Sequence, residues 1–219
     1  VVFMLDRAGF ANGDGETHQG LFDIAYLRHI PNMRILVPAD LRELTEMILS
    51  SVSFDGPCAI RYPKKALAFN QELPAHPFTF GKWERIMRGE SGAILAVGSM
   101  VDTAMKAARK MGSEGIALEV INASTVKPLD TECLWRLAKA KTPVFTLEEH
   151  VLDGGFGSAV LEYGAASGSG LSVHPIAVPS GFVPHGDHQT LMKETGLDMD
   201  TIIGVIRETF RQNGQADGR

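Results

Sequence analysis

The sequence predicts an α/β fold, and three observations support this prediction. Short apolar runs of strand length alternate with longer segments of helical periodicity along most of the chain. The runs at residues 93–97 and 116–121 have the composition of strands buried in a core. A proline-rich stretch at residues 67–81 has neither period, which is typical of a linker laid over a surface. We therefore expect two blocks of alternating strands and helices, each built on a mainly parallel sheet.

The first block covers residues 1–66. Its second helix has the clearest start signal, because Asp40 is followed three residues later by Glu43, a capping pair. In this block we expect strands at 1–5, 33–37 and 57–62 and helices at about 19–29 and 41–52.

The second block covers residues 82–213, a usual domain size, and a polar tail at 214–219 is expected to be disordered. Asp198 is the expected cap of the last helix. In this block we expect strands at 93–97, 116–121, 143–147 and 173–178 and helices at 101–111, 131–140, 155–165, 187–195 and 198–212.

The chain opens directly inside an apparent core strand, Val1 to Leu5. A buried parallel strand needs neighbours on both sides, and the residues after Leu5 can supply only some of them. The expectation is therefore that this sequence is the C-terminal portion of a longer protein.

Composition excludes several classes of function. The net charge of −5, without a basic run, gives no footprint for nucleic acid or an anionic membrane. No apolar segment approaches the roughly 18 residues of a membrane span. Cys58 and Cys133 are isolated, so neither a zinc site nor a disulfide framework is indicated. The default expectation is a cytoplasmic protein.

The polar loop, Asp6 to Gly20, is rich in charged and polar side chains that could bind a ligand. It lies between an apolar run and an expected helix, where α/β enzymes place groups that handle ligands. Arg7 follows one strand and Arg61 ends another, so both could point into the same crevice and bind a phosphate or carboxylate. The alternative, equally supported by spacing, is that each arginine pairs with a local acid such as Asp6 or Asp14.

His18 in the polar loop also has two interpretations. It could donate to a substrate oxygen or move a proton, since the ordinary pKa of an imidazole lies near neutral pH. It could equally cap the expected helix at 19–29.

The second block has a weaker cluster, Glu148-Glu149-His150, which is followed by Gly154, Gly155 and Gly157. These glycines could form an anion-binding helix start. The favoured interpretation is that they allow close packing and that the acids line a domain or subunit contact. His185 and Asp187 are interpreted as structural.

The first block contains the motifs DRAG, GDGETHQG, LRHIPNMRILVPAD and RYP, and the second contains VKPLD, TLEEH, GGFGS and FVPHGD. Together these motifs resemble the 1-deoxy-D-xylulose-5-phosphate synthases, thiamine diphosphate enzymes related to transketolase. The likeness covers nearly the whole chain and implies a partial pyrimidine-binding parallel-sheet domain followed by a transketolase C-terminal-type α/β domain.

The resemblance implies a transferase that decarboxylates pyruvate on thiamine diphosphate and adds the resulting carbanion to D-glyceraldehyde 3-phosphate. Arg7 and Arg61 would clamp the phosphate of the aldehyde, and Asp14 and His18 would face the reacting carbons, with His18 the catalytic candidate. The product would serve isoprenoid, thiamine and pyridoxal synthesis, and the enzyme would be a homodimer.

The same resemblance places the sites for thiamine diphosphate and Mg²⁺ mainly in regions that precede Val1. Gly13-Asp14-Gly15 is not interpreted as the family's metal motif, because the next asparagine, Asn32, comes too early. We therefore expect no cofactor or metal ligands here and no activity from this polypeptide alone. Two alternatives remain open: a transketolase-like ketol transfer, and an assembly module without its own chemistry.

Overall fold

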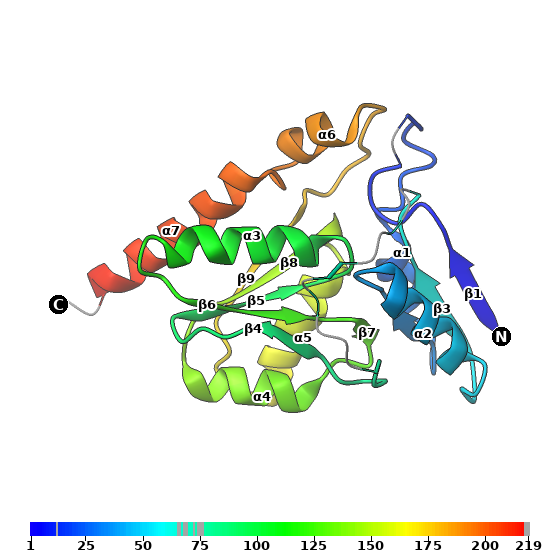
Figure 1. Cartoon of the computed structure of the whole chain (residues 1–219), viewed down its shortest axis with the longest axis horizontal. Helices are drawn as coiled ribbons and strands as arrows, with labels where there is room; N and C mark the ends of the chain where they lie inside the picture. The colour runs from blue at the N-terminus through cyan, green and yellow to red at the C-terminus, as the bar shows by residue number, and fades with distance from the viewer. Residues whose placement is uncertain (12, 65–66, 68–69, 72, 74–76, 217–219) are drawn as a thin grey trace.

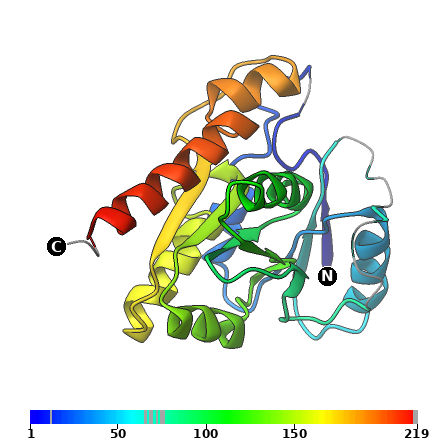
Figure 2. The same cartoon turned by 60° about the vertical axis from the view of Figure 1, so that its left-hand side comes forward.

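The computed structural model describes residues 1–216 except 12, 65–66, 68–69, 72 and 74–76. In this described part the chain forms two sheets covered by helices, which confirms the predicted α/β class. Figure 1 shows the first strand and the last helix on opposite sides of the molecule, and Figure 2 shows the same fold turned by 60°. Positions 68–69, 72 and 74–76 of the expected linker and 217–219 of the expected tail lie outside the described residues.

The first sheet has four strands in the order β1-β3-β2-β7. The first three are parallel, and the helices α1 and α2 connect them, as the alternation predicts. The last strand, which was not predicted from the sequence, comes from the second block and pairs antiparallel with β2. The elements are β1 (Val2–Leu5), α1 (Asp23–Arg28), β2 (Arg34–Leu36), α2 (Leu41–Ser51), β3 (Cys58–Arg61) and β7 (Thr125–Lys127).

The second sheet has five strands in the order β4-β6-β5-β8-β9, of which only β4 runs antiparallel to its neighbour. The helices α3 and α7 lie on one face of this sheet and α4 and α5 on the other (Figure 1). The elements are β4 (Glu84–Met87), β5 (Gly92–Ala96), α3 (Met100–Gly112), β6 (Leu118–Asn122), α4 (Thr131–Ala140), β8 (Val144–Val151), α5 (Phe156–Ser167), β9 (Val173–Val178), α6 (His188–Glu194) and α7 (Met199–Ala216).

The apolar run of β5 explains why the second sheet is covered on both faces. Alternate side chains of a strand point to opposite faces. Ile94 and Ala96 accordingly belong to the core beneath α3 and α7, whereas Ala93 and Leu95 belong to the core beneath α4 and α5. A strand with two buried faces has no polar alternation, which is the pattern the sequence shows.

Two expectations about element ends were wrong. The helix α1 begins at Asp23, not at about 19, because Gly20 is held in a bridge to Gly9. The helix α7 continues to Ala216, so residues 214–216 do not belong to a disordered tail. The strand β1 lies at the edge of its sheet, with Phe3 44% and Met4 42% exposed, and among the described strands it pairs only with β3.

The bridge between Gly9 and Gly20 closes the polar loop at its base. Each backbone N–H donates to the carbonyl oxygen of the other residue at 2.9 Å. A Cβ atom at Gly20 would lie 2.0 Å from the carbonyl oxygen of Arg7 and 2.9 Å from Cα of Ala8. Only glycine therefore allows the two ends of the loop to approach so closely.

We expect Gly20→Ala to lower the free energy of unfolding by about 1–3 kcal/mol, the usual cost of overpacking against groups that cannot move away. The matched control is Gly15→Ala in the same loop, where no atom lies within 4 Å of the added Cβ. Urea unfolding of both variants tests this, and equal stabilities for the two would contradict it.

Candidate functional site

The polar loop lies at the carboxyl edge of the first sheet. Leu5 at the end of β1 is in register with Arg61 at the end of β3, and the N–H of Ala8 donates to the carbonyl oxygen of Tyr62 at 3.0 Å. The two strand ends that carry Arg7 and Arg61 are therefore neighbours at one edge of the sheet. This edge is where parallel α/β sheets carry their ligand sites.

Arg7 lies at the exposed mouth of the loop with its side chain 40% accessible. Its Nη1 donates to Asp6 at 2.7 Å, and its Nε donates to Asp14 at 3.3 Å. Lys64 Nζ also donates to Asp14, at 2.8 Å. The hydrogen bond from Lys64, more than that from Arg7, holds the pKa of Asp14 below its ordinary value. The mouth thus combines cationic and anionic groups that are open to solvent.

Arg61, in contrast, is only 4% exposed. Its Nε donates to both oxygens of Asp23, at 2.9 and 2.7 Å. Its Nη2 donates to the carbonyl oxygens of Gly20 at 2.7 Å and Glu149 at 3.0 Å. Both arginines therefore pair with carboxylates, Arg7 with the acids that the sequence suggested and Arg61 with one that it did not. Their binding of a substrate phosphate stays a prediction.

His18 is exposed in a turn of the polar loop. Its backbone N–H donates to the carbonyl oxygen of Gly15 at 2.9 Å, and its Nδ1 lies 3.0 Å from Thr17 Oγ1. Because α1 begins only at Asp23, the interpretation of His18 as a helix cap was wrong. The structure leaves the imidazole open to solvent, and its catalytic role stays a prediction.

His150 provides the cap of α1, a role that was not predicted from the sequence. This buried side chain lies in β8, and its Nε2 accepts from the backbone N–H groups of Ile24 at 3.1 Å and Ala25 at 3.4 Å. Its Nδ1, 2.7 Å from the carbonyl oxygen of Val151, then carries the proton. Burial lowers the pKa of His150 to about 4, so the ring is neutral and can accept these bonds. The sequence feature that could have predicted this role was the polar motif TLEEH at the end of an expected strand.

Glu148 occupies the start of α5 that the glycines had suggested as an anion site. Its carboxylate accepts from the backbone N–H groups of Phe156 at 2.7 Å and Gly157 at 2.6 Å. A Cβ at Gly157 would lie 2.7 Å from Thr146 Oγ1. Burial raises the pKa of Glu148 to about 7. The helix start is therefore filled by a side chain of this chain, and the glycine allows close packing.

The segment 182–188 of the second block lies against the polar loop, as Figures 1 and 2 both show. Gln19 connects the two, because its Oε1 accepts from the N–H of Ala11 at 2.7 Å and its Nε2 donates to the carbonyl oxygen of Pro184 at 3.3 Å. Asp187 accepts from the N–H of Thr190 and so caps α6, a structural role.

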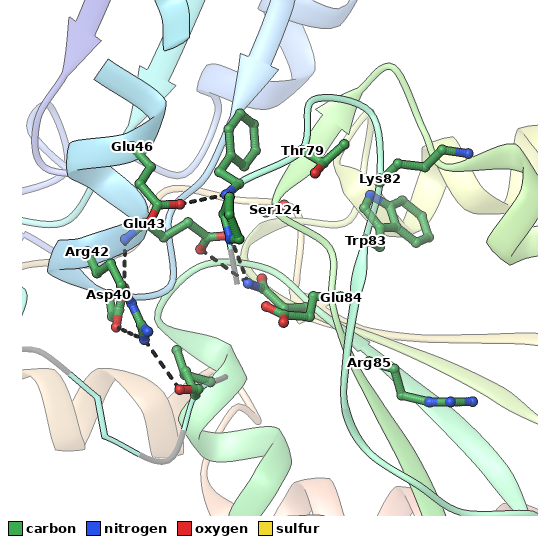
Figure 3. A pocket seen from close by; sticks show the side chains of 14 residues that line it. Asp40, Arg42, Glu43, Glu46, Thr79, Lys82, Trp83, Glu84, Arg85 and Ser124 are labelled. Atoms are coloured by element: carbon green, nitrogen blue, oxygen red, sulfur yellow. Dashed lines mark hydrogen bonds and ion pairs between the residues drawn. The ribbon is translucent and has the colours of Figure 1, made fainter. Parts of the chain in front are cut away.

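A pocket of about 370 Å³ lies elsewhere, between α2 and the β4–β6 edge (Figure 3). Arg7, Asp14, His18 and Arg61 do not line it. Its polar groups pair mostly with residues of this chain: Glu46 accepts from the N–H of Phe78, Lys82 pairs with Glu132 and Arg85 pairs with Glu119. We interpret this pocket as a seam between the blocks, because most of its charged side chains already pair with groups of this chain.

Glu43 is a partly buried carboxylate of this seam, and within the described residues it accepts hydrogen bonds only from uncharged donors. Figure 3 shows its side chain among the lining residues. Its carboxylate accepts from the N–H of Ala39 at 2.7 Å and from Asn122 Nδ2 at 3.0 and 3.1 Å. Burial raises the pKa of Glu43 from 4.5 to about 7. The Oδ1 atom of Asn122 is buried and has no hydrogen-bond partner within the described residues.

Because the pKa of Glu43 is higher in the folded than in the unfolded state, its ionisation destabilises the fold as pH rises from 4.5 through about 7. We expect Glu43→Gln to remove this loss, so that the variant gains roughly 1–3 kcal/mol over wild type at pH 8 compared with pH 5. Urea unfolding at both pH values measures this gain. The exposed Glu16→Gln variant is the control, and an equal gain there would refute the assignment.

The described residues contain no group of three or more His, Cys, Asp or Glu side chains placed to hold a metal ion. Among the described helices, none is both long and apolar enough to cross a membrane.

Comparison with known families gives two matches. Residues 1–70 match the model of the transketolase pyrimidine-binding domain, and residues 81–202 match that of the transketolase C-terminal domain. The second match alone spans more than half of the chain, and both agree with the α/β layers described above.

Similar proteins carry the name 1-deoxy-D-xylulose-5-phosphate synthase. One from Pelotomaculum thermopropionicum is 45% identical over 97% of this chain and 34% of its own length. One from Heliobacterium modesticaldum is 41% identical over 95% of this chain and 32% of its own length. The chain thus spans about a third of the length of the curated relatives that it matches.

Solved structures agree with the family models. A chain described as "Split gene transketolase, inactive beta4 tetramer" is 29% identical, with a TM-score of 0.85 over 95% of this chain and 66% of that one. Transketolase from Campylobacter jejuni shares the fold at 18% identity, with a TM-score of 0.71 over 94% of this chain and 31% of that one. The chain therefore belongs to the transketolase family, with pyrimidine-binding-domain sequence followed by a transketolase C-terminal domain.

Proposed function

We propose that this chain forms part of a 1-deoxy-D-xylulose-5-phosphate synthase, which condenses pyruvate with D-glyceraldehyde 3-phosphate and releases carbon dioxide. The observation that carries the proposal is 45% identity to a protein of that name over 97% of this chain. By the same likeness the enzyme would be a cytoplasmic homodimer that serves isoprenoid, thiamine and pyridoxal synthesis. The alternative is a transketolase-like ketol transfer.

The described residues contain no cluster of His, Cys, Asp or Glu side chains placed to hold Mg²⁺. We propose that regions corresponding to the remaining two-thirds of the relatives bind thiamine diphosphate and Mg²⁺. The share of the reaction that falls to this chain is then the handling of the phosphorylated aldehyde.

Arg7 is the proposed primary contact of the phosphate. It lies at the exposed mouth, where a phosphate would replace the carboxylates of Asp6 and Asp14 as its partner. Charge-assisted hydrogen bonds of this kind contribute about 1.5–3 kcal/mol each. Arg61 is the proposed second contact through Nη1, for which no partner is assigned within the described residues.

His18 and Asp14 are proposed to face the reacting carbons from the same loop. The exposed imidazole of His18 would give a proton to the aldehyde oxygen as it becomes a hydroxyl group. Asp14, held ionised by Lys64, would accept a hydrogen bond from a substrate hydroxyl group.

The decisive experiment measures carbon dioxide release from pyruvate and D-glyceraldehyde 3-phosphate in the presence of thiamine diphosphate and Mg²⁺. We expect no turnover by this chain alone and turnover once the regions matching the rest of its relatives are added. The similar solved chain described as inactive supports the first expectation. Turnover by this chain alone would refute that part. Activity with a ketose phosphate donor in place of pyruvate would favour ketol transfer.

In the assembled enzyme we expect Arg7→Ala to raise KM for D-glyceraldehyde 3-phosphate roughly tenfold or more, because it removes charge-assisted bonds to the phosphate. KM for pyruvate should stay within about twofold, since pyruvate carries no phosphate. The matched control is Arg211→Ala, which removes an exposed arginine that pairs with Glu208 on α7. An unchanged KM for the aldehyde would favour an assembly module.

A further inference from the structure

One buried carboxylate of the second block accepts a hydrogen bond from the backbone of the polar loop. Glu149 lies in β8 and is only 5% exposed. Its Oε1 accepts from the backbone N–H of Phe10 at 2.6 Å, across 139 residues of sequence. Phe10 lies in the loop between Arg7 and Asp14. The bond therefore joins the C-terminal domain to the segment that carries the proposed acceptor groups.

The carboxylate of Glu149 is itself fixed on several sides. Its Oε2 accepts from Ser99 Oγ at 3.1 Å, at the start of α3. Its Oε1 also lies 3.3 Å from His188 Nε2 in α6, and the ring of His188 packs edge-on against Phe10 with centroids 6.0 Å apart. Elements of the second block thus hold Glu149 in one position, so it can set the position of the loop.

The loop is shaped to receive this carboxylate. Gly9 has a φ of 76°, which favours glycine, and a Cβ there would lie 2.5 Å from the carboxyl group of Glu149. Phe10, next to it, is 5% exposed and packs in the core of the second block. Any larger residue at position 9 would push the loop away from β8.

The position of this contact within the loop gives it a functional consequence. Gly9 and Phe10 separate Arg7, the proposed phosphate contact, from the turn that carries Asp14 and His18. Fixing the backbone between them therefore sets how far apart these side chains lie. Displacements of about 1 Å in such groups can cost roughly a hundredfold in rate. A packed apolar side chain could fill the space but could not accept the N–H of Phe10.

We propose that Glu149 is a positioning residue for the acceptor site, through which the C-terminal domain holds Arg7 and His18 in the geometry that receives the phosphorylated aldehyde. The inference rests on the proposed function, since it assigns Glu149 to the aldehyde half of that reaction. Glu149 acts through the N–H of Phe10 and does not touch the substrate.

The test compares Glu149→Ala with Glu149→Gln in the assembled enzyme. The glutamine keeps one oxygen for the N–H of Phe10, whereas the alanine leaves that buried donor without a partner. The control is Glu162→Gln, an exposed carboxylate of α5 with a side chain 65% accessible. Two readouts are measured: KM for each substrate, and amide hydrogen exchange in the polar loop and in β5.

We expect Glu149→Ala to raise KM for D-glyceraldehyde 3-phosphate roughly tenfold, with KM for pyruvate within about twofold. Exchange should accelerate in the polar loop and stay unchanged in β5, because the second sheet does not depend on this bond. Glu149→Gln should restore most of the wild-type KM and of the wild-type loop exchange. A general loss of stability would not show this rescue. Should the alanine variant fail to fold, Gly9→Ala is measured instead, because its added Cβ would lie 2.5 Å from the carboxyl group of Glu149. Faster loop exchange with a raised KM for the aldehyde then supports the inference, and unchanged values of both overturn it.

Two further results would overturn the inference. One is an active Glu149→Ala enzyme with unchanged KM for the aldehyde, and the other is an equal rise in KM for both substrates. Failure of the proposed function has a different signature, because the wild-type assembly would then release no carbon dioxide. In that case, unchanged hydrogen exchange in the polar loop of Glu149→Ala would also refute the positioning role. Faster exchange there would support the positioning of the loop by Glu149 and would remove only its link to the aldehyde.

Discussion

The buried guanidinium of Arg61 is the interaction on which the arrangement around the polar loop depends. It joins Asp23 at the start of α1, the carbonyl oxygen of Gly20 at the end of the loop and that of Glu149 in β8. A buried charge is costly unless it is paired and hydrogen-bonded, and here a carboxylate and two carbonyl groups compensate it. Loss of one partner would therefore disturb the loop, the helix and the strand together.

Three consecutive polar side chains of β8 each hold a neighbouring segment, and two of these segments belong to the first block. Successive side chains of a strand point to opposite faces, so Glu148 and His150 share one face and Glu149 takes the other. On the first face Glu148 caps α5 and His150 caps α1, and on the other Glu149 holds the loop at Phe10. A short polar sequence at a strand end thus caps two helices and holds the polar loop, and two of these three contacts join the second block to the first.

The seam and the polar loop differ as candidate ligand sites, and the pairing of their charged groups shows this difference more clearly than the shape of the surface does. The seam pocket is the more hollowed feature, yet Glu46, Lys82 and Arg85 already have partners there. At the loop, Arg7 pairs only with neighbouring carboxylates that a phosphate can replace, and the imidazole of His18 is open to solvent. Exposed ion pairs contribute little stability, so exchanging them for a ligand costs little.

The sequence by itself determined the alternation of strands and helices, the Asp40 cap of α2 and the place of the polar loop after β1. These follow from local periodicity, capping and composition, which short segments carry themselves. Only the tertiary structure decided that β7 joins the first sheet, that α1 begins late and that Arg61 is buried. Each of these depends on contacts between residues far apart in the chain. A local sequence pattern cannot predict such contacts, because it is the same whichever distant segment packs against it.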